Sequence, residues 1–156
     1  MSISKMHEII RSLGSGNYGR GAGPQEILDA ERKMGVVFPR SYKDFLSAFG
    51  WARVSFDMLY GLGADVPAPY DLVKNVFCER CDAHPHIPHH LVPIMNDGAG
   101  NHYCLDISRF HDAECPVVFW DHEHDDGPNQ SPEEVSPSFD GWLTDLIVNA
   151  SSPNQD

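Results

Sequence analysis

The sequence has no long uninterrupted hydrophobic run. Its first fourteen residues mix apolar side chains with Lys5, Glu8 and Arg11, so we expect no secretory signal peptide. No later stretch reaches the roughly 18 consecutive apolar residues that a membrane-spanning helix needs. We therefore expect a cytoplasmic protein that does not enter a membrane.

Cysteine is also scarce, with only Cys78, Cys81, Cys104 and Cys115 in the chain. Because we expect no leader, we predict that these residues are reduced thiols and not disulfides. The fold must then depend on its hydrophobic core. A chain of 156 residues, of which 41% are hydrophobic, is large enough to bury such a core as one domain.

Basic residues are almost missing from the second half of the chain. Residues 81–156 contain fourteen acidic residues and one basic residue, Arg109. Residues 1–80, in contrast, contain ten basic and nine acidic residues. The net charge of −12 argues against nucleic acid or an anionic membrane as a partner, since both require clusters of Lys and Arg. The acidic half serves either solubility or the attraction of a basic protein, and composition leaves both open.

Hydrophobic periodicity predicts an α+β fold. Helical spacing occurs over residues 3–13, 24–35, 40–50, 70–80 and 138–147, the last with Ser138 as its N-cap. Strand patterns occur over residues 54–60, 91–95, 102–107 and 116–120. We predict a single layer of mostly antiparallel strands, flanked by an N-terminal helix pair and a C-terminal helix.

Five glycines between residues 14 and 23 predict a flexible linker after the first helix. We therefore divide the chain into an N-terminal helix with its Gly-rich linker (1–23), a domain (24–150) and a tail (151–156).

Two clusters contain metal-binding side chains. The segment 78–90 has a Cys78-x-x-Cys81 pair followed by His84, His86, His89 and His90, which are residue types that zinc prefers. All of them lie within thirteen residues interrupted by two prolines, and this crowding favours a histidine-rich loop over a zinc site.

The second cluster, His122-x-His124-x-Asp126, resembles part of the H-x-H-x-D-H signature of metallo-β-lactamase-like hydrolases. Gly127 stands where the third histidine belongs, and no histidine follows His124. We therefore expect no metal, no cofactor and no catalytic residue.

An acidic segment follows the strand pattern at 116–120. Gly127, Pro128 and Pro132 interrupt it, so it is unsuited to a helix, and its charges are costly to bury. We predict an exposed loop, which is a common place for binding residues, although a merely solvated loop is the alternative. The candidate partner-binding residues are Asp121, Glu123, Asp125, Asp126, Glu133 and Glu134.

Four segments together resemble the SUKH superfamily, which includes the yeast regulator of cell-wall synthesis and many bacterial immunity proteins. Residues 27–50 resemble its opening helix pair and residues 91–107 its central hairpin. Residues 117–123 resemble the next strand and residues 138–147 the closing helix. The resemblance covers roughly residues 24 to 148, so the N-terminal helix and its linker are extra to it.

The resemblance implies a binding domain without catalytic residues. The role it implies is that of an immunity protein that neutralises a cognate toxin, frequently a nuclease whose basic cleft would attract an acidic inhibitor. An intracellular scaffold or regulatory module of the same fold is the alternative, and a zinc-dependent enzyme is a distant third. The oligomeric state stays open. The motif residues expected in the core are Tyr42, Phe45, Leu46, Tyr103, Trp120 and Trp142.

Overall fold

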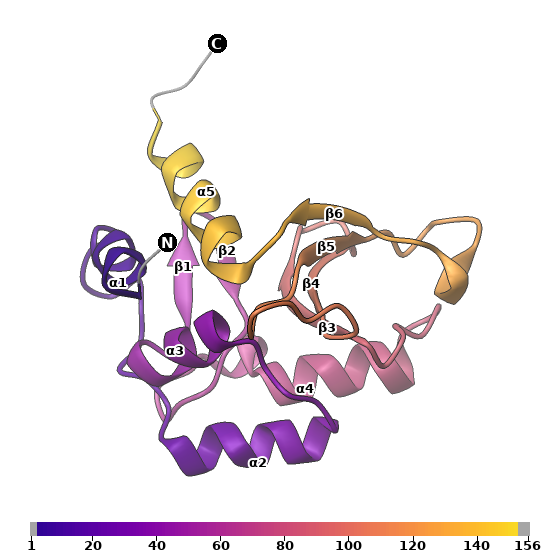
Figure 1. Ribbon diagram of the computed structural model, residues 1–156, viewed down its shortest axis with the longest axis horizontal. Helices are drawn as coiled ribbons and strands as arrows, with labels where there is room; N and C mark the ends of the chain where they lie inside the picture. Colours follow the sequence, from indigo (N-terminus) through magenta and orange to yellow (C-terminus); the bar gives the residue numbers. More distant parts are fainter. Residues whose placement is uncertain (1–2, 153–156) are drawn as a thin grey trace.

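A computed structural model describes residues 3–152, which form five α-helices and one six-stranded sheet (Figure 1). The strands are β1 (Ala52–Val54), β2 (Asp57–Leu59), β3 (Leu91–Asn96), β4 (His102–Asp106), β5 (Val117–Trp120) and β6 (Glu133–Ser136). They lie side by side in chain order, and every neighbouring pair is antiparallel. The predicted α+β class with an antiparallel sheet is confirmed.

The helices are α1 (Ile3–Arg11), α2 (Pro24–Met34), α3 (Arg40–Ala48), α4 (Leu72–Phe77) and α5 (Phe139–Ser151), with a π-helical turn at Cys78–Asp82 extending α4. Gly35 ends α2 at φ +68°, a conformation that glycine adopts without strain. The hydroxyl of Ser138 accepts a hydrogen bond from the Gly141 N–H and caps α5, as its sequence predicts. No helix among residues 3–152 is long and apolar enough to cross a bilayer.

Two strand predictions differ from the structure. The single strand expected over residues 54–60 is a tight hairpin, because Ser55 takes φ +58° and reverses the chain so that Val54 pairs with Asp57. Residues 133–136, expected in a loop, form β6 at the edge of the sheet. An edge strand has only one partner strand and tolerates charged side chains, so Glu133 and Glu134 did not signal a strand.

The Gly-rich segment 14–23 is packed and not a flexible linker. The Gly19 N–H donates to the Trp51 carbonyl at 3.1 Å, and the Ala22 N–H donates to the Leu46 carbonyl at 2.8 Å. At Gly21 an added Cβ would lie 2.1 Å from the Ser47 carbonyl oxygen. Gly19 and Gly21 therefore allow the backbones to approach closely, whereas Gly14, Gly16 and Gly23 have no such close neighbour.

One main core joins the helices to the sheet. Met6 and Ile10 of α1 are buried in it together with Tyr42 and Phe45 of α3 and residues of α5, so α1 packs as part of the same core. A second, smaller cluster of Ile87, Leu91, Cys104, Val118 and Trp120 lies under the segment that precedes β3. Of the six motif residues expected in the core, Tyr103 is the exception, because it is partly exposed.

A buried histidine connects the centre of the sheet to the residue that follows β2. His102 of β4 is 1% exposed, and its Nε2 lies 3.1 Å from the Tyr60 hydroxyl. The Glu79 carboxylate is 3.9 Å away. Burial lowers the pKa of His102 to about 4, against an opposing effect of Asp97, so the ring is neutral at pH 7.

Replacing Trp142 by alanine should lower the free energy of unfolding by about 3–5 kcal/mol, as truncation of a buried aromatic side chain does. Trp142 is 6% exposed, and its ring contacts those of Phe139 and Tyr103. Denaturant titration measures the change. Phe56→Ala is the control, because Phe56 is fully exposed and its removal should leave stability unchanged. Equal stability of Trp142→Ala and wild type would contradict the packing of α5.

Acidification should destabilise the protein through His102. In the unfolded state His102 binds a proton below about pH 6.5, whereas in the folded state it does so only below about pH 4. The free energy of unfolding therefore falls as the pH is lowered through this window. From about pH 7 to about pH 5 this one group should cost about 2 kcal/mol. His102→Gln should make the unfolding free energy less dependent on pH across this window. Identical pH profiles for wild type and His102→Gln would contradict this account.

Candidate functional site

The β5–β6 connection, residues 121–132, is held in one conformation by the side chain of Gln130. Gln130 is 8% exposed; its amide oxygen accepts from the Asp121 N–H, and its amide nitrogen donates to the carbonyls of Asp121 and Gly127. The Asp121 carboxylate accepts in turn from the Glu123 N–H at 2.9 Å. The polar interior of the loop is therefore satisfied by its own residues, which fixes its shape.

A second set of bonds ties this loop to the β3–β4 turn. The Asn101 side-chain oxygen lies 2.7 Å from Nδ1 of His122, and its amide nitrogen donates to Asp97 at 3.0 Å. Burial alone would raise the pKa of Asp97. Hydrogen bonds donated to its carboxylate by Ala99 and Asn101 have the larger effect and hold the pKa below its ordinary value. Asp97 is thus a fixed negative charge beside the loop.

The structure separates the six candidate residues into three groups. Glu123, Asp125 and Asp126 are exposed at the loop surface, with 83% of the Glu123 side chain and 71% of the Asp126 side chain accessible. Asp121 is half-buried, and its carboxylate supports the loop. These four lie together in one loop that follows β5; the exposure expected from the sequence is found for three of them and not for Asp121.

Glu133 and Glu134 lie in β6, where pairing directs them to opposite faces of the sheet. Glu133 pairs with Phe119, and Glu134 pairs with Val118. The Glu134 carboxylate lies 3.6 Å from Arg109, which also donates to Asp106. Glu134 is therefore engaged by the one basic residue of the second half of the chain, whereas Glu133 stays near the acidic loop.

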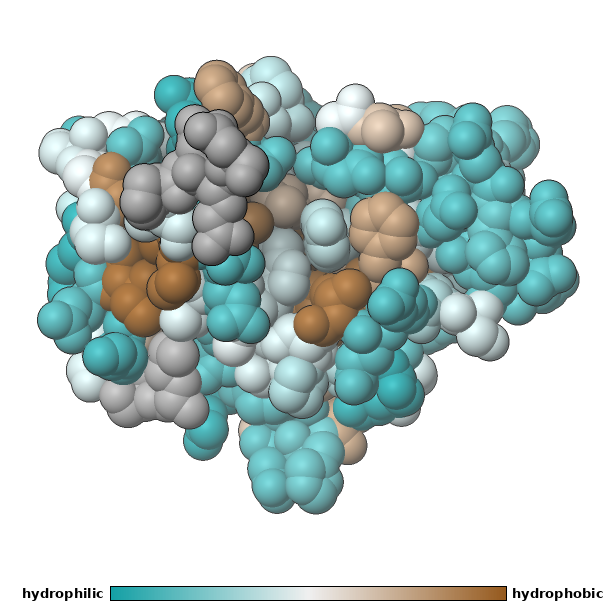
Figure 2. All heavy atoms as spheres, turned by 90° about the horizontal axis from the view of Figure 1, so that it is seen from above, coloured by the Kyte–Doolittle hydropathy of each residue, from teal (hydrophilic) through white to brown (hydrophobic). Residues whose placement is uncertain are grey.

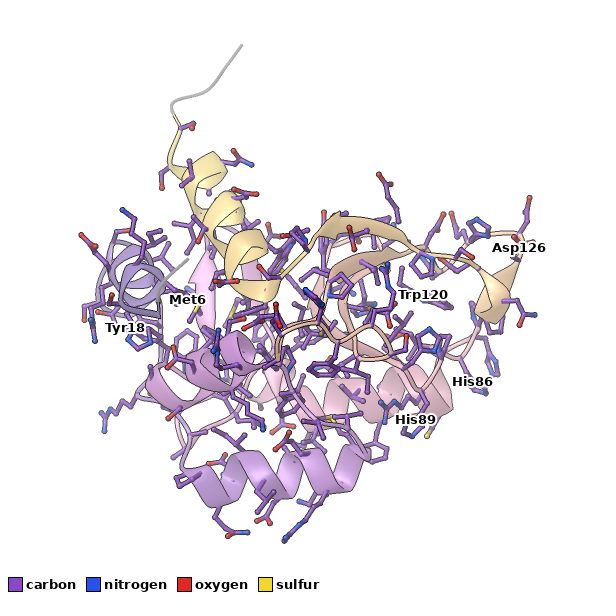
Figure 3. The ribbon with its side chains drawn as sticks, viewed as in Figure 1. Met6, Tyr18, His86, His89, Trp120 and Asp126 are labelled. Atoms are coloured by element: carbon purple, nitrogen blue, oxygen red, sulfur yellow. The ribbon has the colours of Figure 1, made fainter. Side chains whose placement is uncertain are left out.

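The histidine-rich segment 78–90 lies against the acidic loop. Figure 3 shows His86 and Asp126 at the same end of the molecule, and an added Cβ on Gly127 would lie 3.9 Å from Pro85. Cys78 and Cys81 are exposed, and the rings of His84 and His86 are 4.7 Å apart. Within residues 3–152 no three His, Cys, Asp or Glu side chains come close enough together to hold a metal ion.

The other two cysteines are poor nucleophiles. Cys104 and Cys115 are buried, and burial raises the pKa of Cys104 well above its ordinary value and that of Cys115 to about 12. Both thiols stay protonated at neutral pH, whereas nucleophilic catalysis requires the thiolate. The exposed ionisable side chains of this region are mainly the carboxylates of the β5–β6 loop and the histidines of segment 78–90.

Comparison with known proteins agrees with this picture. The SPbeta prophage-derived protein YokK of Bacillus subtilis (strain 168) is 23% identical over an alignment 173 positions long. The alignment covers 94% of this chain and 87% of that protein. A family model described as SMI1-KNR4 cell-wall (SUKH_5) matches residues 6–148. The match begins within α1, so it includes residues that lie outside the segments quoted for the resemblance. The chain belongs to the SMI1-KNR4, or SUKH, family.

Proposed function

We propose that this chain is an immunity protein that binds a cognate bacterial toxin one to one in the cytoplasm and blocks its activity. We further propose that the toxin is a nuclease. The observation that carries the proposal is the acidic β5–β6 loop, which is exposed on its outer side and held rigid on its inner side by Gln130.

Rigidity matters because binding a flexible loop would cost conformational entropy. A loop already fixed in its bound shape avoids that cost, so its charges contribute more to affinity. The cleft of a nuclease must neutralise phosphates and is therefore basic. A set of fixed carboxylates complements such a cleft and accelerates association with it.

The candidate residues have different roles in this proposal. Glu123, Asp125 and Asp126 contact the toxin, and Asp121 holds the loop in place. Glu133 extends the acidic surface along β6, and Glu134 contributes least because Arg109 offsets its charge.

The family supports a binding role over an enzymatic one, since SUKH domains are generally binding domains and include immunity proteins. The prophage origin of the similar Bacillus subtilis protein supports a bacterial setting over the scaffold role of the eukaryotic members.

The proposal predicts that a toxin domain is encoded next to the gene for this chain, and it is tested with that domain. Cells producing that domain should die, and co-production of this chain should restore their growth. The purified proteins should form a one-to-one complex in light-scattering chromatography, and the complex should have lost nuclease activity. Absence of both protection and a complex would overturn the proposed function.

Reversing two loop charges should slow association with that toxin. Asp125→Lys with Asp126→Lys should reduce the association rate constant by about tenfold or more at low salt and make it less salt-dependent. Glu8→Lys with Asp29→Lys changes the net charge equally at exposed residues of α1 and α2, and should have a much smaller effect. Both variants should melt as wild type does. Equal rates for the two variants would remove the loop from the interface.

A further inference from the structure

One face of the sheet carries a row of side chains that runs from the core to the solvent. Cross-strand pairing connects Leu59 of β2 to Met95 of β3, Met95 to Tyr103 of β4, Tyr103 to Phe119 of β5, and Phe119 to Glu133 of β6. Directly opposed residues of neighbouring strands lie on the same face. The five side chains therefore form one continuous row across the sheet.

Helix α5 covers only the inner part of this row. Leu59 and Met95 are buried, Tyr103 and Phe119 are partly exposed, and Glu133 is exposed. The ring centroids of Trp142 in α5 and Tyr103 are 5.5 Å apart, and those of Tyr103 and Phe119 are 5.3 Å apart. We call Tyr103 and Phe119 the aromatic strip. Figure 1 shows the sheet extending past α5 towards β6.

The surface around the strip is acidic. Asp57 lies in β2 two residues before Leu59, and the Asp97 N–H donates to the carbonyl of Asn101, two residues before Tyr103, so both acidic residues lie at the turn end of these strands on the side of the row. Burial raises the pKa of Tyr103, and the negative charges of Asp97 and Asp57 raise it further. Glu133 lies beside Phe119 at the other end. Seen from above in Figure 2, hydrophilic side chains cover the loop end of the molecule, and apolar ones reach the surface between that end and α5.

Aromatic faces bordered by carboxylates suit one type of side chain. The aliphatic stem of arginine packs on rings, its guanidinium is attracted to their faces, and carboxylates accept its hydrogen bonds. A purely apolar partner would leave the neighbouring carboxylates desolvated and unpaired, which is costly. A nucleic acid would be repelled by them.

We propose that the aromatic strip is a binding site for an arginine side chain of the protein partner, with Asp57, Asp97 and Glu133 as the flanking anions. This rests on the proposed function, because it assumes the same basic partner, but it adds an apolar contact that the acidic loop does not supply. The loop would attract the partner, and the strip would slow its dissociation.

The experiment uses an acetylated tetra-arginine peptide and, as its neutral counterpart, acetylated tetra-citrulline. Titration of the full chain, followed by NMR, should shift the side-chain signals of Tyr103 and Phe119 with the arginine peptide only. Phe119→Leu keeps an apolar side chain but removes the ring, and it should weaken arginine-peptide binding by about three- to tenfold. Glu133→Gln should weaken it as well, without affecting the fold.

The matched control is Phe110→Leu, the same substitution at a 42% exposed phenylalanine outside the row, which should leave binding unchanged. The strip is overturned if the arginine peptide causes no shift while it remains soluble. It is also overturned if shifts occur only at Glu123, Asp125 and Asp126, or if Phe119→Leu binds as wild type does.

Failure of this proposal and failure of the proposed function can be told apart. If the toxin is neutralised equally by wild type and Phe119→Leu, with equal dissociation rates, the arginine-binding role of the strip is wrong and the proposed immunity function is retained. If the arginine peptide binds the strip but no toxin is neutralised, the arginine-binding role is retained and the proposed immunity function is wrong.

Discussion

The register of β4 between β3 and β5 decides what each face of the sheet presents. Side chains alternate along a strand, so His102 and Cys104 point to one face and Tyr103 and Leu105 to the other. The first pair is buried, while Tyr103 begins the strip that reaches solvent. A shift of one residue would bury Tyr103 against the second cluster and place His102 at the surface. The burial of His102, the second, smaller cluster and the aromatic strip all depend on this register.

Side-chain amides hold the loops that carry the charges. Gln130 closes the β5–β6 loop from within, and Asn101 connects it to Asp97 in the neighbouring turn. These bonds do not use the carboxylates of Glu123, Asp125 and Asp126, which are left at the surface. The acidic loop is therefore hydrogen-bonded on its inner side, while its carboxylates stay exposed to solvent.

Predictions from periodicity were most accurate for the amphipathic helices of the N-terminal part of the chain. Helices α1, α2 and α3 begin where predicted and end within two residues of the predicted bounds, because each has an apolar stripe and a glycine shortly after its end. Helix α5 continues four residues past its predicted end. The hairpin of β1 and β2 was missed because the alternating pattern of residues 54–60 continues through its turn and therefore resembles one strand. Strand β6 was missed because an edge strand needs only one apolar face and here contains two glutamates.

The sequence by itself determined the α+β class and the separation of acidic from basic residues along the chain, because these follow from composition and local pattern. The family was indicated by resemblance to known sequences. Only the tertiary structure decided which acidic residues share a surface. Glu133 and Glu134 are adjacent in sequence, yet strand pairing sends one beside Phe119 and the other to Arg109. It likewise decided that Tyr103 is partly exposed and that Gly19 and Gly21 lie in close contacts. Long-range pairing sets these features, and no local pattern of residues encodes it.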